Sequence, residues 1–232
     1  MLATLFSVQT NSMRLLQVWQ FKSGNLESAA ADPKDREVVI PAQADLTGDG
    51  EQDKVLLLPG RITISSQGNA IWESPSDWDV RSALLGDLNH DGLIEVDLLV
   101  WRAYQPWPVD KFLPFGGRTA EFHDASGKSC HLILIGWKGT GFRELWAGSA
   151  LARPLAEIAI ADLDGDGKQE LAALESDYLQ PQDDPSDSLA VWSWNGFGFD
   201  LMARVSGIFT TLEVVTHPGS VDRLKTEIRP TS

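Results

Sequence analysis

The chain has 232 residues, of which 43% are hydrophobic, enough for a buried core and too many for a disordered or fibrous protein. Acidic residues outnumber basic ones 33 to 19, so the formal net charge of -14 disfavours binding to nucleic acid or to an anionic membrane. Cys130 is the only cysteine, which excludes an internal disulfide and a zinc site made of several thiolates.

Residues 1–14 are interpreted as an N-terminal extension. They have no basic residue ahead of the apolar stretch and no hydrophobic region of the length that a signal peptide needs. The apolar runs elsewhere are far shorter than the roughly 20 residues that span a bilayer. The sequence therefore predicts no membrane insertion, and a single folded domain over residues 15–228.

The first expected element is a β-hairpin over residues 15–29. Two β-rich stretches flank the turn formed by Lys22, Ser23, Gly24 and Asn25, and a short turn that contains glycine is typical of a hairpin. The same signal returns at residues 132–142 and 189–199, and in a looser copy at residues 62–72. We find no amphipathic helical pattern in the sequence, so an all-β protein is predicted.

Three acidic loops of one pattern lie between these hairpins. We name them loop one (Asp45–Asp53), loop two (Asp87–Glu95) and loop three (Asp162–Glu170). Each loop follows a short apolar stretch and leads into another, so the repeated unit is strand, acidic loop, strand.

The spacing of the loops predicts a β-propeller. Asp45 and Asp87 lie 42 residues apart, close to the length of a four-stranded propeller blade, roughly 40 to 50 residues. The longer interval before loop three is explained by an inserted loop at residues 102–130, which is irregular and rich in proline and glycine. A shorter polar connection at residues 178–186 interrupts the third unit.

The two ends of the chain are expected to complete one blade together. The chain starts with an outer-type hairpin, and residues 209–216 resemble an inner strand without its acidic loop. Such a composite blade would remove exposed sheet edges. We predict a four-bladed propeller, with a five-bladed ring or an open repeat array as the alternatives.

The acidic loops have the pattern of a hard-cation site. Oxygen-bearing residues alternate at positions 1, 3, 5 and 9, glycine allows the bend at position 6, and position 7 offers its carbonyl, which together suit the 6 to 8 oxygen ligands of calcium. An EF-hand would need a glutamate at position 12 and flanking helices, and neither is present. The predicted ligands are Asp45, Thr47, Asp49, Glu51 and Asp53; Asp87, Asn89, Asp91, Leu93 and Glu95; and Asp162, Asp164, Asp166, Lys168 and Glu170. Up to three calcium ions are expected, with Thr47 and Asn89 weakening their sites, and His90 is expected to point outward.

On these three loops, residues 15–225 resemble the FG-GAP (VCBS) repeat family, whose blades carry Asp-x-Asp-x-Asp-Gly-x-x-Asp calcium loops. The resemblance implies an integrin-α-like propeller, with the loop residues above as its calcium ligands. It also implies an extracellular or cell-envelope recognition or adhesion module whose partner is a protein or a glycan. Calcium at millimolar concentration outside cells is consistent with this location.

The inserted loop carries the candidate partner-binding residues. They are aromatic residues and one arginine on a connection, where binding residues concentrate: Tyr104, Trp107, Phe112, Phe115 and Arg118. An equally open interpretation is that these aromatics plug the propeller. Trp19, Trp137, Trp146, Trp192 and Trp194 are expected to pack between sheets.

A weaker alternative is a hydrolase or lyase that acts on a polysaccharide or an ester through the inserted loop. The local residues with suitable chemistry are His123, Asp124, Ser126, Cys130 and His131. No established catalytic motif accompanies them, and structural roles are favoured for all five. A non-enzymatic function is therefore expected.

Overall fold

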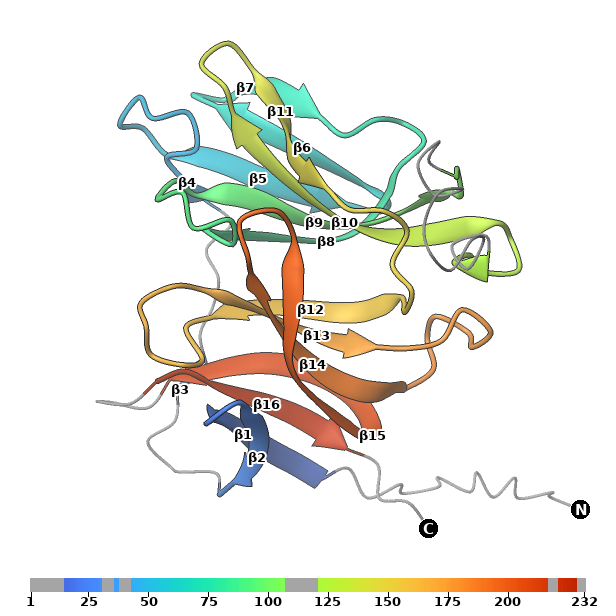
Figure 1. Cartoon of the computed structure of the whole chain (residues 1–232). Helices are drawn as coiled ribbons and strands as arrows, with labels where there is room; N and C mark the ends of the chain where they lie inside the picture. Colours follow the sequence, from blue (N-terminus) through green and yellow to red (C-terminus); the bar gives the residue numbers. More distant parts are fainter. Residues whose placement is uncertain (1–14, 31–35, 38–42, 107–120, 217–220, 229–232) are drawn as a thin grey trace, which may run out of the picture.

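The computed structural model describes residues 15–30, 36–37, 43–106, 121–216 and 221–228. It confirms the all-β prediction, because the described residues form strands and turns and contain no α-helix. Three antiparallel sheets lie over one another in layers (Figure 1). Among the described residues, no helix has the length and apolar character needed to cross a membrane.

The first sheet contains the two strands that loop one connects. Its four strands run in the order in which the chain forms them: β4 (Gln43–Ala44), β5 (Asp53–Leu58), β6 (Arg61–Ser66) and β7 (Asn69–Glu73). The predicted looser hairpin is confirmed, since β6 and β7 pair around a turn at Gln67 and Gly68. The apolar stretch expected to form a strand before loop one, residues 38–40, lies outside the described residues.

The second sheet contains the two strands that loop two connects, and it also has four consecutive strands. They are β8 (Asp79–Gly86), β9 (Glu95–Ala103), β10 (Lys128–Trp137) and β11 (Phe142–Ala147). The bounds of the inserted loop were wrong at both ends, because Ala103 pairs with Lys128 and Arg102 with Ser129. The ladder between β9 and β10 therefore continues into the segment that composition alone assigned to the loop, by two residues on β9 and by three on β10.

The third sheet contains eight strands, two of which loop three connects. Seven follow one another across the sheet and one short strand pairs at the side; the strands are β12 (Leu155–Ala161), β13 (Glu170–Glu175), β14 (Ser186–Trp194), β15 (Phe199–Thr216), β16 (Arg223–Ile228), β1 (Leu15–Lys22), β2 (Asn25–Ala29) and β3 (Arg36–Glu37). The long strand β15 pairs with β14 through its first half and with β16 through its second half. One strand thus belongs to two four-stranded units.

The N-terminal hairpin and the C-terminal strands form one sheet, as predicted. Strand β1 pairs with β16 from Leu15 opposite Ile228 to Trp19 opposite Leu224. The sequence did not predict β16, because its polar residues at alternate positions hide a strand that is buried on one face, where Leu224 and Thr226 are inaccessible. The β1–β2 pair shows that the first expected hairpin forms.

Three hydrophobic cores fill the spaces between the layers. On β9, Val96, Leu98 and Val100 face the first core, shared with Ile62 and Ile64 of β6. The alternate residues Leu99 and Trp101 face the second core, together with Ile158 and Ile160 of β12. The third core lies within the eight-stranded sheet and contains Trp19, Phe209 and Leu224. Both faces of the middle strands are therefore buried, which explains their continuous apolar runs.

Candidate functional site

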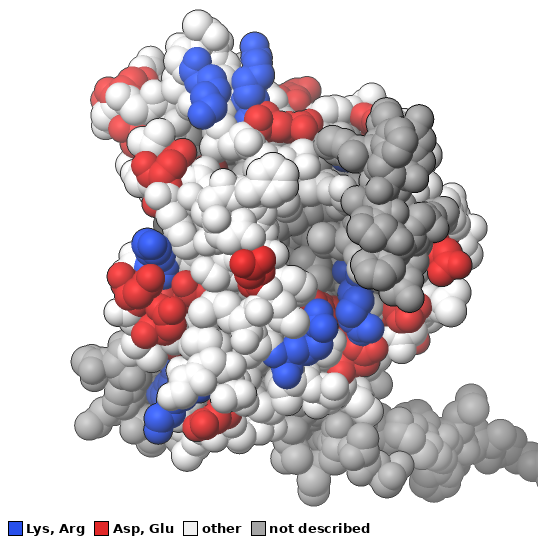
Figure 2. Space-filling model, viewed as in Figure 1, with Lys and Arg blue, Asp and Glu red and all other residues white. Residues whose placement is uncertain are grey.

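The three acidic loops lie at one edge of the molecule, because each connects the first two strands of a four-stranded unit (Figure 1). In the space-filling view, acidic side chains gather along this edge, at the left (Figure 2). The loops share one local geometry. It is built by the aspartate at position 1 and the glycine at position 6.

The first aspartate of each loop caps backbone amides of the same loop. The position-6 amides of Gly50 and Gly92 donate to Asp45 and Asp87 at 2.9 Å, and that of Gly167 donates to Asp162 at 3.1 Å. These glycines have φ values of 87°, 84° and 86°, a left-handed conformation that residues with a Cβ rarely adopt. The sequence therefore folds each loop tightly around its first carboxylate.

The acid at position 9 lies buried beneath each loop and accepts amides from its start. Asp53 Oδ2 accepts the amides of Leu46 and Thr47 at 2.9 Å. Glu95 Oε1 accepts the amide of Asn89 at 3.0 Å, and Glu170 Oε2 accepts that of Leu163 at 2.9 Å. The second oxygens of two of these acids, Asp53 Oδ1 and Glu95 Oε2, are buried without a hydrogen-bond partner in the part of the chain that the structure describes.

Loops two and three each bring three acids together, but not the same three. In loop two Asp87, Asp91 and Glu95 place one oxygen each within 4.8 Å of one another. In loop three the acids that meet this criterion are Asp162, Asp164 and Asp166. Loop one, with Asp45, Asp49 and Asp53, does not form such a group among the described residues. Both groups have a composition suited to a metal ion.

The remaining predicted ligands occupy the same loops. Thr47 Oγ1 is buried without a hydrogen-bond partner, and Asn89 Oδ1 accepts the amide of Asp91 at 2.9 Å. The residues at position 7 donate their amides to the acid at position 5; they are Glu51, Leu93 and Lys168. The ligand role of their carbonyl groups stays a prediction.

Burial raises the pKa of the acids under loops two and three. It raises the pKa of Glu95 to about 8, with further increases from Asp87 and Asp91. The pKa of Glu170 rises to about 7 by burial, with smaller contributions from the other acids of its loop. These shifts express how unfavourable the uncompensated negative charge is at this edge.

An additional buried acid that the sequence did not reveal, Asp97 on β9, lies beside loop two. Its side chain is fully buried, and neither carboxylate oxygen has a hydrogen-bond partner among the described residues. Burial, followed by the charges of Glu95 and Asp87, raises its pKa well above the ordinary value. The available signal was an acid inside the apolar run from Val96 to Val100.

Loops two and three are joined through Gln169. The amide of Asp87 donates to Gln169 Oε1 at 2.7 Å, and His90 Nε2 lies 2.9 Å from the Gln169 carbonyl oxygen. The expectation that His90 points outward was therefore wrong, because its ring binds the neighbouring loop. Gly86 leaves room for this contact, since a Cβ there would lie 2.9 Å from Gln169 Oε1.

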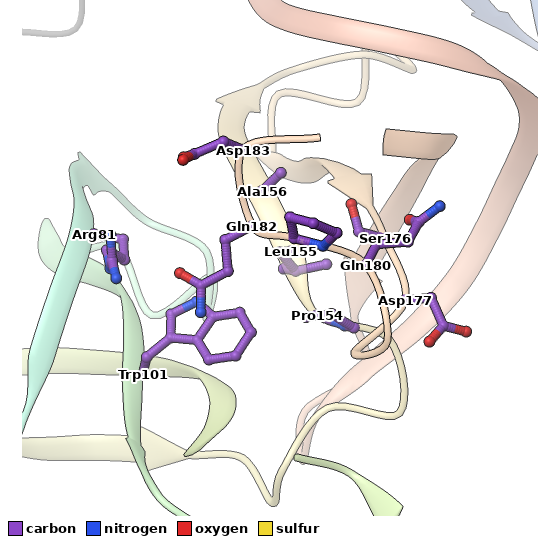
Figure 3. Close-up of a pocket in the computed structure, with 11 residues that line it drawn as sticks. Arg81, Trp101, Pro154, Leu155, Ala156, Ser176, Asp177, Gln180, Gln182 and Asp183 are labelled. Atoms are coloured by element: carbon purple, nitrogen blue, oxygen red, sulfur yellow. The ribbon is translucent and has the colours of Figure 1, made fainter. Parts of the chain in front are cut away.

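A second candidate region is a cavity of about 240 Å³ between the second and third sheets. Arg81 and Trp101 line it from one side, and Ser176 and Gln180 line it from the other (Figure 3). The amide of Gln182 lies beside the indole of Trp101 (Figure 3). The polar connection at residues 178–186 thus forms one wall of the cavity.

This cavity adjoins the described part of the inserted loop. Gln182 Nε2 donates to Asp124 Oδ2 at 3.4 Å, and the Tyr178 hydroxyl accepts the amide of Cys130 at 3.1 Å. The two irregular connections therefore meet in space, which their separation in the sequence did not reveal.

Of the predicted partner-binding residues, only Tyr104 is described. Its ring lies 5.6 Å from that of His123 between centroids, and its hydroxyl is buried with no hydrogen-bond partner among the residues that the structure describes. Trp107, Phe112, Phe115 and Arg118 lie outside the described residues. Trp101, the residue before the predicted loop, belongs to β9 and is buried in the second core.

The suggested catalytic residues have structural partners. Asp124 Oδ1 accepts the amides of Ser126 and Lys128 at 2.8 and 3.0 Å, which closes a turn. Burial raises the pKa of Cys130 to about 12, so its thiol is not a ready nucleophile. A pair that the sequence did not reveal is Ser129 and His131, buried with Ser129 Oγ 2.8 Å from His131 Nε2.

The chain matches no protein-family model, and a search of curated proteins finds no match.

Proposed function

We propose that the chain is a calcium-binding recognition module whose three acidic loops hold structural ions. The observation that carries this proposal is the pair of buried, unpartnered oxygens, Asp53 Oδ1 and Glu95 Oε2, beneath loops one and two. An uncompensated buried carboxylate is costly, and a bound cation removes that cost. Calcium is favoured over magnesium because it takes more oxygen ligands in flexible geometry, including backbone carbonyls.

We further propose that the three sheets form the four blades of a propeller, with two blades supplied by the third sheet. The third sheet divides at β15 into two units of four strands, and one of them combines both ends of the described chain. The first strand of three units leads into an acidic loop, as in the FG-GAP (VCBS) repeats that the loops resemble. A hydrophobic core between each pair of successive units supports this arrangement.

The recognition function is supported by the convergence of the two irregular connections. Rigid strands present them beside one cavity, where Trp101, Arg81 and Gln182 supply aromatic, cationic and amide groups. Binding residues concentrate on such connections. The partner class remains a protein or a glycan, and an extracellular or cell-envelope location follows from the calcium proposal.

Thermal unfolding in calcium and in chelator tests the calcium proposal. Calcium should raise the Tm by mass action, and Asp166→Ala should lose most of this gain because Asp166 belongs to the acid group of loop three. Asp124→Ala is a matched control, since Asp124 also accepts backbone amides but lies in no such group. Equal Tm values with and without calcium would refute the proposal.

The rival function, a hydrolase, is kept because of one observation. Ser129 lies against His131 Nε2, and His131 Nδ1 lies 3.1 Å from the Gly148 carbonyl oxygen. A serine hydroxyl beside a histidine ring that a third group orients is the arrangement of an activated serine nucleophile. A screen with ester and polysaccharide substrates decides the matter: hydrolysis that Ser129→Ala abolishes would favour the enzyme over the recognition module.

A further inference from the structure

Asp97 lies where the packing of the sheets would be expected to exclude a charge. Its neighbours across the strands are Leu84 on β8 and Leu134 on β10. Both leucines belong to the second core or pack against it, and alternation along β9 places Asp97 on the same face as Leu99 and Trp101. The carboxylate is therefore directed into the apolar space between the second and third sheets.

Comparison of the three repeats shows that the fold itself does not need an acid there. Asp97 is the second residue after the position-9 acid of loop two. The corresponding residues are Val55 after loop one and Ala172 after loop three, which lie buried in the first and third cores. An apolar side chain satisfies the same packing position twice, so the acid in the second unit needs a separate explanation.

Among the described residues, no cation supplies that explanation. The charges that act on Asp97 are those of Glu95 and Asp87, which are also negative. Glu95 lies two residues before it on the same face of β9, and Glu95 Oε2 is buried and unpartnered as well. Three carboxylate oxygens of two adjacent acids thus share one buried region without a donor among the described residues.

We propose that Asp97 belongs to the cation site of loop two and holds a divalent, oxygen-preferring ion from the sheet side, together with Glu95. This inference rests on the proposed calcium function and adds to it a residue outside the nine-residue loop. Loop two then has four acids, Asp87, Asp91, Glu95 and Asp97, as many as loop three. The substitution of aspartate by Asn89 at position 3 is thereby offset, so loop two binds calcium more tightly than loop one.

The test is a calcium titration by calorimetry, combined with thermal unfolding in calcium and in chelator. The variants are Asp97→Asn, which keeps the shape, and Asp97→Val, which installs the residue of the first repeat. We expect one class of sites to weaken about tenfold or more. Both variants should keep or raise the Tm in chelator, because a buried unpartnered carboxylate is removed, and their gain from calcium should shrink.

Glu175→Gln is the matched control. Glu175 is equally buried, but Arg204 Nε lies 2.7 Å from its Oε2, so its charge is compensated within the chain. This variant should lower the Tm by the same amount in calcium and in chelator and leave the titration unchanged. If the parent binds calcium and both Asp97 variants bind it with parental affinity at every site, the role of Asp97 is refuted while the calcium function stands. If the parent binds no calcium, both proposals fall.

Discussion

Two regions of the molecule differ in whether their buried polar groups have partners within the chain. Two buried groups on β13 and β10 have partners within the chain: Glu175 forms ion pairs with Arg204 and Arg153, and His131 contacts Ser129 and the Gly148 carbonyl. At the edge with the acidic loops, oxygens of Asp53, Glu95 and Asp97 are buried without partners.

The difference indicates which region is complete in the isolated chain. A buried charge with good partners can be neutral for stability, whereas one that lacks a partner is strongly unfavourable. Pairing at Glu175 is fixed by residues of β15 and by Arg153, so it needs nothing from solution. The acidic loops have backbone donors for only part of their oxygens, and we infer that an ion completes them.

The largest effect is expected from Glu175→Ala. It leaves Arg204 and Arg153 without their shared acid and opens a space in a packed region, so the free energy of unfolding should fall by about 3 kcal/mol. Denaturant unfolding should give the same loss in calcium and in chelator. A loss that depends on calcium would remove the distinction between the two regions.

A pH effect of similar size is expected from His131. Burial lowers its pKa from 6.5 to about 4, so between these values the unfolded chain binds the proton and the folded chain does not. The free energy of unfolding is therefore unaffected by protonation of His131 above pH 6.5. As the pH falls toward 4, protonation of His131 in the unfolded chain lowers this free energy by at most about 3 kcal/mol. Denaturant unfolding of His131→Gln should show a smaller fall over this range than the parent, and equal falls would contradict the assignment.

A smaller effect is expected from Gln169→Ala, which removes the acceptor of the Asp87 amide. The free energy of unfolding should fall by about 1 kcal/mol.

Disabling loop three with Asp166→Ala should weaken calcium binding by loop two in the parent, because Gln169 connects them. Gln169→Ala removes the side-chain contact with the Asp87 amide but keeps the backbone carbonyl beside His90, so in this background the effect should be reduced. Calorimetry on the four chains measures it. Parental coupling without Gln169 would show that the loops communicate by another route.

The smallest effect on stability is expected when residues 105–126 are replaced by an Asn-Gly turn. The Tyr104 amide already donates to the Gly127 carbonyl at 2.8 Å, so the β9–β10 ladder can close as a two-residue hairpin. The Tm should change by only a few degrees and its response to calcium should remain. A collapsed fold would favour the interpretation that the aromatic residues of this segment plug the core.

The sequence predicted the parts of the molecule that are locally encoded. Glycine turns at Gly24 and Gly68 and the alternation around each acidic loop were sufficient to place the hairpins and the loops. The loop fold follows from contacts within nine residues, such as the amide of Gly167 on Asp162. These features need no knowledge of the rest of the chain.

The missed features depend on contacts between distant segments. Strand β16 is recognised as a strand only when β1 and β15 lie on either side of it. Gln169 and His90 meet because two loops are neighbours in space, 79 residues apart in the chain. The burial of Asp97 follows from the layer that covers β9, which periodicity alone does not show. Long-range packing decided each of these outcomes.

The most direct test of the central claim is a crystal of the parent grown in calcium, with anomalous scattering measured at a wavelength where calcium contributes. We expect a peak inside each acidic loop, beside Asp45 and Asp53, beside Asp87 and Glu95, and beside Asp162 and Asp166, with the peak of loop two in contact with Asp97. An ordered structure without anomalous density at any of the three loops would contradict the account.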